Sequence, residues 1–155
     1  MIVATAVSSV SWPYKSRKSK LMEPTEILPI IAIVSLVTVE FGGHALLRFI
    51  TTDHEKLGGF RERFFRAGHA HAGVLLLLSL VYLLYLPRAG FSTGLEWLAG
   101  GVLMVGVLAQ SGGFFLHLAV GEQGARSSGT MLTRAGGLLL AIALITLAVG
   151  LAAAA

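Results

Sequence analysis

The sequence predicts an all-α integral membrane protein, built as a four-helix bundle, and three observations support this fold class. Hydrophobic residues make up 55% of the chain and charged residues only 13%. Soluble domains carry about 25% charged residues, so much of this surface is expected to face lipid. Four apolar stretches each reach the length of about 20 residues that a helix needs to cross a bilayer. Short polar or glycine-rich loops separate these stretches.

The transmembrane domain is predicted over residues 25–155, with spans at about 27–50, 64–86, 94–120 and 134–155. Residues 1–24 are predicted to form a flexible or interfacial tail. Their apolar start is short and the basic residues follow it, so they do not make a convincing signal peptide. An alternative is that Met22 is the true start, with residues 1–21 as an upstream extension.

The loops at 51–63 and 121–133, with the adjoining helix ends, hold most of the arginines of the transmembrane domain. On the opposite side Arg88 is the one basic residue outside the tail, although counting the tail weakens this bias. Because cytoplasmic loops carry an excess of Lys and Arg, we expect both loops in the cytoplasm and both termini outside. The expected location is a bacterial cytoplasmic membrane.

A weak internal repeat links the two halves of the chain. Glu40 to Gly43 resembles Gln110 to Gly113, and Arg66 to Gly68 resembles Arg134 to Gly136. Each copy would be a helical hairpin, and two such hairpins would be parallel repeats about an axis along the membrane normal. Chance is an equal explanation, because glycine and alanine are common throughout the chain.

Four histidines are predicted to occupy one layer of the membrane, on the side of the loops at 51–63 and 121–133: His44, His69, His71 and His117. Imidazole is the commonest ligand for transition metals, and cores of helix bundles are where such sites are built. The pattern therefore suggests a transition metal or haem held between the first three spans. His69 and His71 lie about 200° apart around a helix, so one of them would serve. Structural roles near the helix ends are an equal alternative.

A second group of polar residues lies deeper, near the middle of the bilayer. Glu40, His44 and Arg48 follow one stripe of the first span, and Gln110 starts a matching stripe on the third. A carboxyl group at mid-depth is a functional candidate, so Glu40, Gln110 and Arg48 are candidates for proton or ion handling. We expect the Glu40 carboxyl to point into the bundle, towards Gln110 or Gly73. The alternative is a structural hydrogen bond between Glu40 and His44 or Arg48.

These observations restrict the function. The chain has no cysteine, which excludes disulfides and thiolate metal sites, and it has no basic face for nucleic acid. It also lacks the motifs of hydrolases and nucleotide enzymes, so an enzyme acting alone is disfavoured. The first hypothesis is a subunit or accessory protein of a larger membrane assembly, with other subunits or further copies of itself as partners in the lipid bilayer. The second is a proton-coupled transporter or channel, and the third is a purely structural or assembly protein.

Overall fold

The computed structural model describes residues 22–52 and 54–155, without the side chains of residues 54–57, so the predicted tail lies almost wholly outside it. Four helices dominate: α1 (Pro24–Thr51), α2 (His54–Tyr85), α3 (Thr93–Val120) and α4 (Ser128–Ala154). Each is long and apolar enough to cross a membrane. The predicted fold class, an all-α membrane protein of four helices, is confirmed.

Each end of α1 has a local cause. Glu23 caps the helix start in a reciprocal pair with Glu26, and Pro24 occupies the first turn, where its missing N–H costs nothing. At the other end the backbone N–H of Thr52 donates to the carbonyl of Arg48 at 2.9 Å.

Helix α2 begins before its predicted span. Most of the predicted loop at 51–63 is helical, with a break at Gly58, whose φ of 52° is one that glycine adopts readily. After the break, Arg66 and Glu62 form an ion pair of 2.8 Å across one helical turn, which supports a helix in this polar stretch. A short 3₁₀ helix, η1 (Leu86–Ala89), follows α2 and leads into Gly90.

The starts of α3 and α4 are fixed by serine caps. Ser92 Oγ accepts a hydrogen bond from the N–H of Leu95. Ser127 Oγ accepts from the N–H groups of Gly129 and Thr130, so α4 begins at Ser128 and not near residue 134. Such caps satisfy the backbone donors that every helix leaves free at its start.

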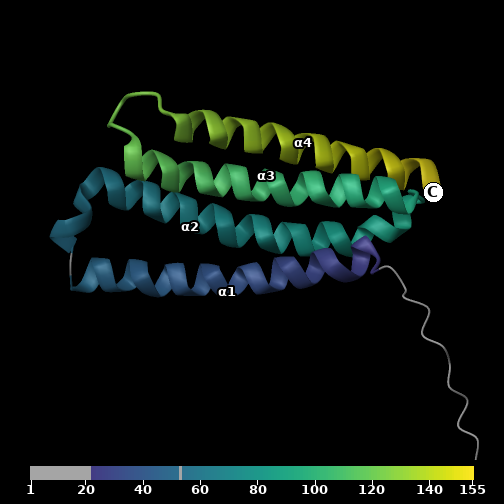
Figure 1. The fold of residues 1–155 in the computed structure, drawn as a ribbon, viewed down its shortest axis with the longest axis horizontal. Helices are drawn as coiled ribbons and strands as arrows, with labels where there is room; N and C mark the ends of the chain where they lie inside the picture. The colour runs from purple at the N-terminus through teal and green to yellow at the C-terminus, as the bar shows by residue number, and fades with distance from the viewer. Residues whose placement is uncertain (1–21, 53) are drawn as a thin grey trace, which may run out of the picture.

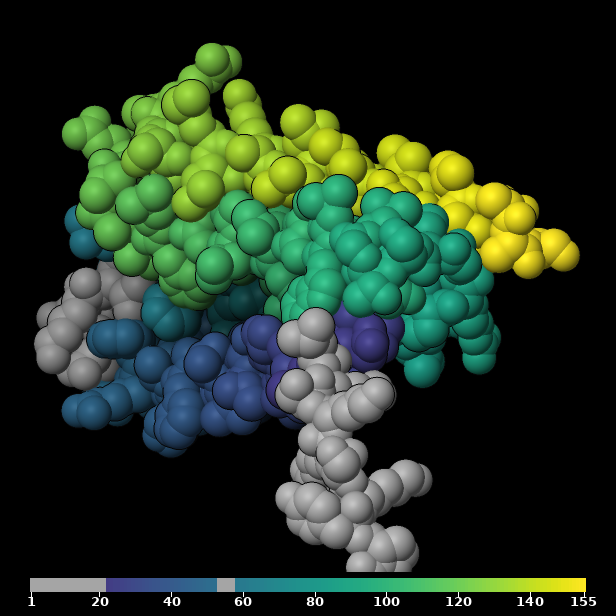
Figure 2. All heavy atoms as spheres, turned by 45° about the vertical axis from the view of Figure 1, so that its right-hand side comes forward, coloured from purple at the N-terminus to yellow at the C-terminus, as the bar shows by residue number. Residues whose placement is uncertain are grey.

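In Figure 1 the helices lie side by side in the order α4, α3, α2 and α1. The α1–α2 and α3–α4 connections are at one end of the molecule, and η1 and the C-terminus are at the other. α2 and α3 therefore form the middle of the bundle, with α1 and α4 on opposite flanks. Figure 2 shows these flanking helices along the two sides of an elongated surface.

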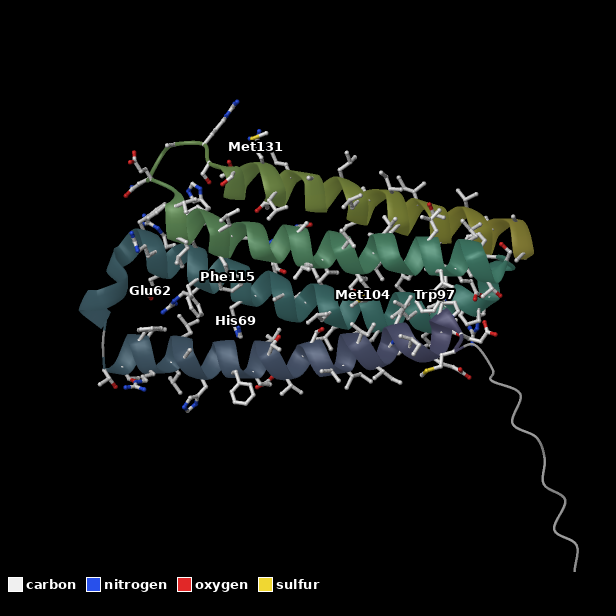
Figure 3. The ribbon with its side chains drawn as sticks, in the orientation of Figure 1. Glu62, His69, Trp97, Met104, Phe115 and Met131 are labelled. Carbon is white, nitrogen blue, oxygen red and sulfur yellow. The ribbon has the colours of Figure 1, made fainter. Side chains whose placement is uncertain are left out.

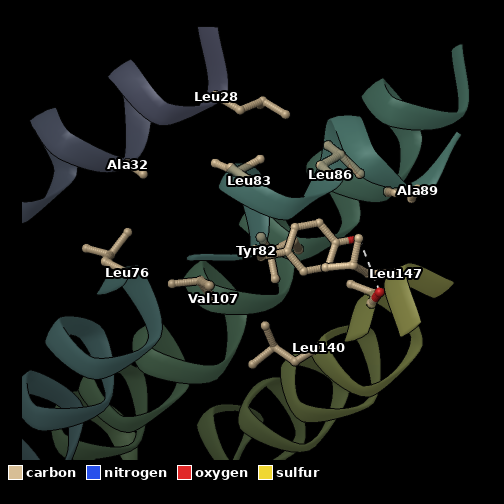
Figure 4. Close-up of a cluster of buried hydrophobic side chains, with 13 residues drawn as sticks. Leu28, Ala32, Leu76, Tyr82, Leu83, Leu86, Ala89, Val107, Leu140 and Leu147 are labelled. Carbon is tan, nitrogen blue, oxygen red and sulfur yellow. Dashed lines mark hydrogen bonds between the residues drawn. The ribbon is translucent and has the colours of Figure 1, made fainter. Parts of the chain in front are cut away.

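The buried core lies towards the end of the bundle that holds η1 (Figure 4). Tyr82 of α2 is 2% exposed, and its hydroxyl donates to the carbonyl of Ala143 in α4 at 3.1 Å. Leu28 and Ala32, near the start of α1, are the members of this core that α1 contributes. The remainder of α1 has few buried side chains, which matters for the site described next.

Helices α3 and α4 approach each other through glycines from their connection to the middle of the bundle. A Cβ atom at Gly136 would fall on the backbone of Gln110, and one at Gly129 would fall on the backbone of His117. A Cβ at Gly113 would in turn meet Thr133. Small residues let helix backbones come this close in a membrane, so this pair of helices is joined backbone to backbone.

Candidate functional site

All four candidate histidines lie in the halves of their membrane spans that run towards the α1–α2 and α3–α4 connections, where the span of α2 is taken as Gly58–Ala89. Their side chains, however, point to four different surroundings.

His117 is fully enclosed at the end of α3. It is 2% exposed, and its ring lies 4.4 Å from the ring of Phe64 and 5.6 Å from that of Phe60. Its Nδ1 is 2.6 Å from Ser127 Oγ. Because that hydroxyl already accepts from two backbone N–H groups, its own proton is available to donate to Nδ1. His117 thereby ties the end of α3 to the cap of α4 and to the start of α2.

The His71 side chain also makes contacts within the bundle. Its Nδ1 lies 2.8 Å from the carbonyl oxygen of Ala67, one turn earlier in α2. Its ring packs against Phe114 of α3, with the ring centres 4.7 Å apart.

His69 points from α2 towards α1, as Figure 3 shows. Its ring lies against the glycine pair of α1: a Cβ at Gly43 would be 3.1 Å from the ring, and one at Gly42 would be 3.4 Å away. A side chain at Gly43 would therefore require the ring to move by a few tenths of an ångström, whereas one at Gly42 would be at the limit of ordinary contact.

His44 is exposed on the outer face of α1, away from the other three. Across the described residues, no group of three or more His, Cys, Asp or Glu side chains is placed to hold a metal ion. His117 and His71 pack instead against the aromatic rings of Phe64 and Phe114, and His69 lies against the glycine pair of α1, so the three imidazoles have separate surroundings.

The predicted direction of Glu40 is wrong. Its side chain is exposed and belongs, with His44 and Leu47, to a shallow hollow on the outer face of α1. The physical reason is the position of Gly42, which lies against His69 on the groove side of α1, whereas Glu40, two residues earlier, lies about 200° away around the helix.

The other two ion-handling candidates also lie apart from any shared interior site. Arg48 is exposed, one turn beyond His44 on the same stripe. Gln110 is half-buried in the α3–α4 contact, where its backbone carbonyl oxygen accepts a hydrogen bond from Thr133 Oγ1 at 3.4 Å. The structure thus joins Glu40, His44 and Arg48 along one surface and does not bring Glu40 to Gln110.

A feature that the sequence analysis missed lies on the inner side of α1. There a groove with a volume of about 420 Å³ runs between α1, α2 and α3. α1 contributes Ser35, Thr38 and Gly42, α2 contributes His69, and α3 contributes Met104, Leu108, Ser111 and Phe115. The sequence signal was the pair of hydroxyl residues on the Gly42 face of α1.

Comparisons with protein-family models, with curated proteins and with solved structures find no match to this chain, so a function has to be inferred from its own residues.

Proposed function

We propose that this small polytopic membrane protein is a subunit or accessory protein of a larger membrane assembly, and that its partner covers the outer face of α1. The observation that carries the proposal is the stripe of Glu40, His44 and Arg48. All three side chains are exposed, although they lie within a helix that is long and apolar enough to span the membrane.

Lipid does not satisfy such a stripe. Glu40 is within two or three residues of the middle of α1, which is about 4 Å from the bilayer centre at 1.5 Å per residue. A charged side chain there costs about 2.5–3.5 kcal/mol on insertion scales, and a neutral carboxyl still needs a hydrogen-bond partner. A polar side chain on a neighbouring transmembrane helix would supply one.

Helix α1 is also the span with the least support from its own chain. In its most apolar window 6% of the residues are buried, compared with 22–33% in the other three helices. A helix so weakly enclosed, with a polar stripe facing outward, has the properties of an interface that another subunit or a second copy completes.

A metal or haem site remains part of this proposal only at the same interface. Glu40 and His44 lie one turn apart on one helix face and together offer two donor groups. A partner would have to supply the remaining ligands.

The described residues give less support to a proton-coupled transporter within a single chain. Glu40 lies on the opposite side of α1 from the groove and from His69. A proton path would therefore have to pass between subunits.

Because the chain contains no cysteine, single cysteines can test the interface directly. Leu47 is 57% exposed beside the stripe on α1, and Ile145 is 63% exposed on the outer face of α4. In native membranes, L47C is expected to cross-link with a thiol- and amine-reactive reagent to a second chain, and I145C is not. The mass of the product distinguishes a second copy from another subunit. Absence of any L47C product, or equal products from both variants, would contradict the proposal.

A further inference from the structure

The groove on the inner side of α1 contains one polar side chain whose hydrogen bonding is not satisfied. Each hydroxyl in its lining donates to a carbonyl of its own helix: Ser35 to Ile31 at 2.7 Å, Thr38 to Ser35 at 2.6 Å, and Ser111 to Val107 at 2.6 Å. His69 makes no hydrogen bond to any described residue, although its ring is half-buried. An imidazole always has at least one N–H donor, so His69 faces the groove with a donor free.

The depth of His69 makes this unusual. It lies four or five residues from the middle of the apolar span Gly58–Ala89, or about 7 Å from the bilayer centre, and the hydrocarbon half-thickness is about 15 Å. Water is scarce at that depth, and a polar group left without a partner there costs several kcal/mol. A molecule within the groove is the natural source of the missing partner.

The groove is long enough in outline to hold a chain-like molecule. Along α1 it extends from Ile31 to Gly42, which is about 16 Å at 1.5 Å per residue. His69 and Phe115 lie near the end towards the loops, and Met104 lies further along the bundle (Figure 3). Its volume of about 420 Å³ falls within the range of about 300–1,000 Å³ of small-molecule sites.

The groove opens sideways towards lipid. Leu108 on its rim is 73% exposed and Val105 is 56% exposed, and both belong to a membrane span. A ligand can therefore enter from the bilayer without passing through water.

We propose that this groove binds a neutral single-chain lipid whose carbonyl or hydroxyl head accepts a hydrogen bond from His69, while its chain lies along α1 towards Met104. Membrane quinones and long-chain alcohols both have this chemistry. An uncharged head is required for two reasons: no charged side chain is among the described residues that line the groove, and its polar end lies inside the hydrocarbon layer.

Glycines on both walls leave room for the His69 ring and for a ligand at the end of the groove that holds His69. The His69 ring lies on the bare backbone of Gly42 and Gly43, with Nδ1 nearest to the Cβ position of Gly42 and Nε2 close to that of Gly43, and neither nitrogen makes a hydrogen bond to a described residue. On the other wall, Gly112 has nothing within 4 Å of the place where a Cβ would be. That space is part of the groove and belongs to the proposed ligand.

This site is independent of the subunit interface proposed above. The groove and the Glu40 stripe lie on opposite faces of α1, so a failure of one proposal leaves the other standing.

The first experiment follows the imidazole nitrogens by NMR in phosphatidylcholine nanodiscs, with ¹⁵N-labelled histidine. A decyl-substituted benzoquinone and dodecanol are added separately, and dodecane serves as a control that has a chain and no head. The His69 resonance is expected to shift saturably with the quinone, the alcohol or both, and not with dodecane. The remaining histidines are internal controls. No saturable shift, or the same shift with dodecane, would overturn the proposal.

The second experiment measures the thermal stabilisation that the head-bearing ligand of the first experiment gives to variants. Gly112→Leu fills the groove and is expected to weaken binding by about tenfold or more. Gly101→Leu is its matched control: Gly101 also has open space at its Cβ position, but it lies outside the groove. His69→Phe is expected to lose about tenfold, the effect of one hydrogen bond, whereas His71→Phe retains the affinity. Equal losses in each matched pair would contradict a specific site.

Discussion

The two helical hairpins of this protein are held together in different ways. In α3–α4, glycines bring one backbone against the other, at Gly136 with Gln110 and at Gly129 with His117. In α1–α2, the glycines of α1 meet only the side chain of His69. The α1–α2 hairpin therefore depends on the α3–α4 hairpin for a rigid framework, whereas the α3–α4 hairpin is held together by its own backbone contacts. The difference explains why both functional proposals concern α1: a loosely held helix has two faces left for other molecules.

The largest expected effect is at the tightest backbone contact. Gly136→Ala should destabilise the protein by about 3 kcal/mol or more, because its Cβ has no space that a side-chain movement can provide. Gly137→Ala is the matched control, with an ordinary contact of 3.5 Å to Gln110 Oε1. Thermal unfolding in detergent measures both. Similar midpoints for the two variants would remove the distinction between the hairpins.

A smaller loss is expected at the polar end of α3–α4. Ser127→Ala removes the α4 cap and the partner of His117 Nδ1, and should cost about 1–2 kcal/mol. Ser128→Ala, at the exposed neighbouring position, should change stability little. The free energy of unfolding is measured for both variants. If Ser128→Ala costs as much, the cap is not what fixes the start of α4.

In the α1–α2 hairpin the corresponding glycine change should be milder. A Cβ at Gly43 would lie 3.1 Å from the His69 ring, which is a side chain and can turn away. Gly43→Ala is therefore expected to cost less than about 1 kcal/mol in stability, and to displace the His69 resonance in the NMR experiment. A loss as large as that of Gly136→Ala would show that both hairpins are equally rigid.

The smallest effect on folding is expected at Glu40. Because its side chain is exposed and makes no hydrogen bond or ion pair to a described residue, Glu40→Gln should leave the free energy of unfolding of the isolated chain unchanged, within about 0.5 kcal/mol. The same change is expected to weaken the L47C cross-link in native membranes. A large loss of stability without any change in cross-linking would assign Glu40 a structural role in place of one at an interface.

The fold class could be predicted from the sequence because hydropathy and length alone distinguish a membrane span. The helix starts could not, since they depend on single polar contacts such as the Ser127 cap and the Glu62–Arg66 ion pair, which hydropathy does not register.

The candidate site was predicted in part. The stripe of Glu40, His44 and Arg48 follows from helical spacing and is present, but its direction depends on which face of α1 meets α2. Gly42 lies on that face, about 200° around the helix from Glu40. The groove depends on the relative positions of three helices, which no local pattern in the sequence contains.

The backbone contacts between α3 and α4 also have a consequence for the order of assembly. Domains and segments that are synthesised first begin to fold first. Here the tightest pair forms only after α4 has been made, so α1 and α2 enter the bilayer while the framework beside them is still incomplete. During that interval the outer stripe of α1 is already in the membrane, so the partner that we propose would be able to bind it before the chain has finished folding.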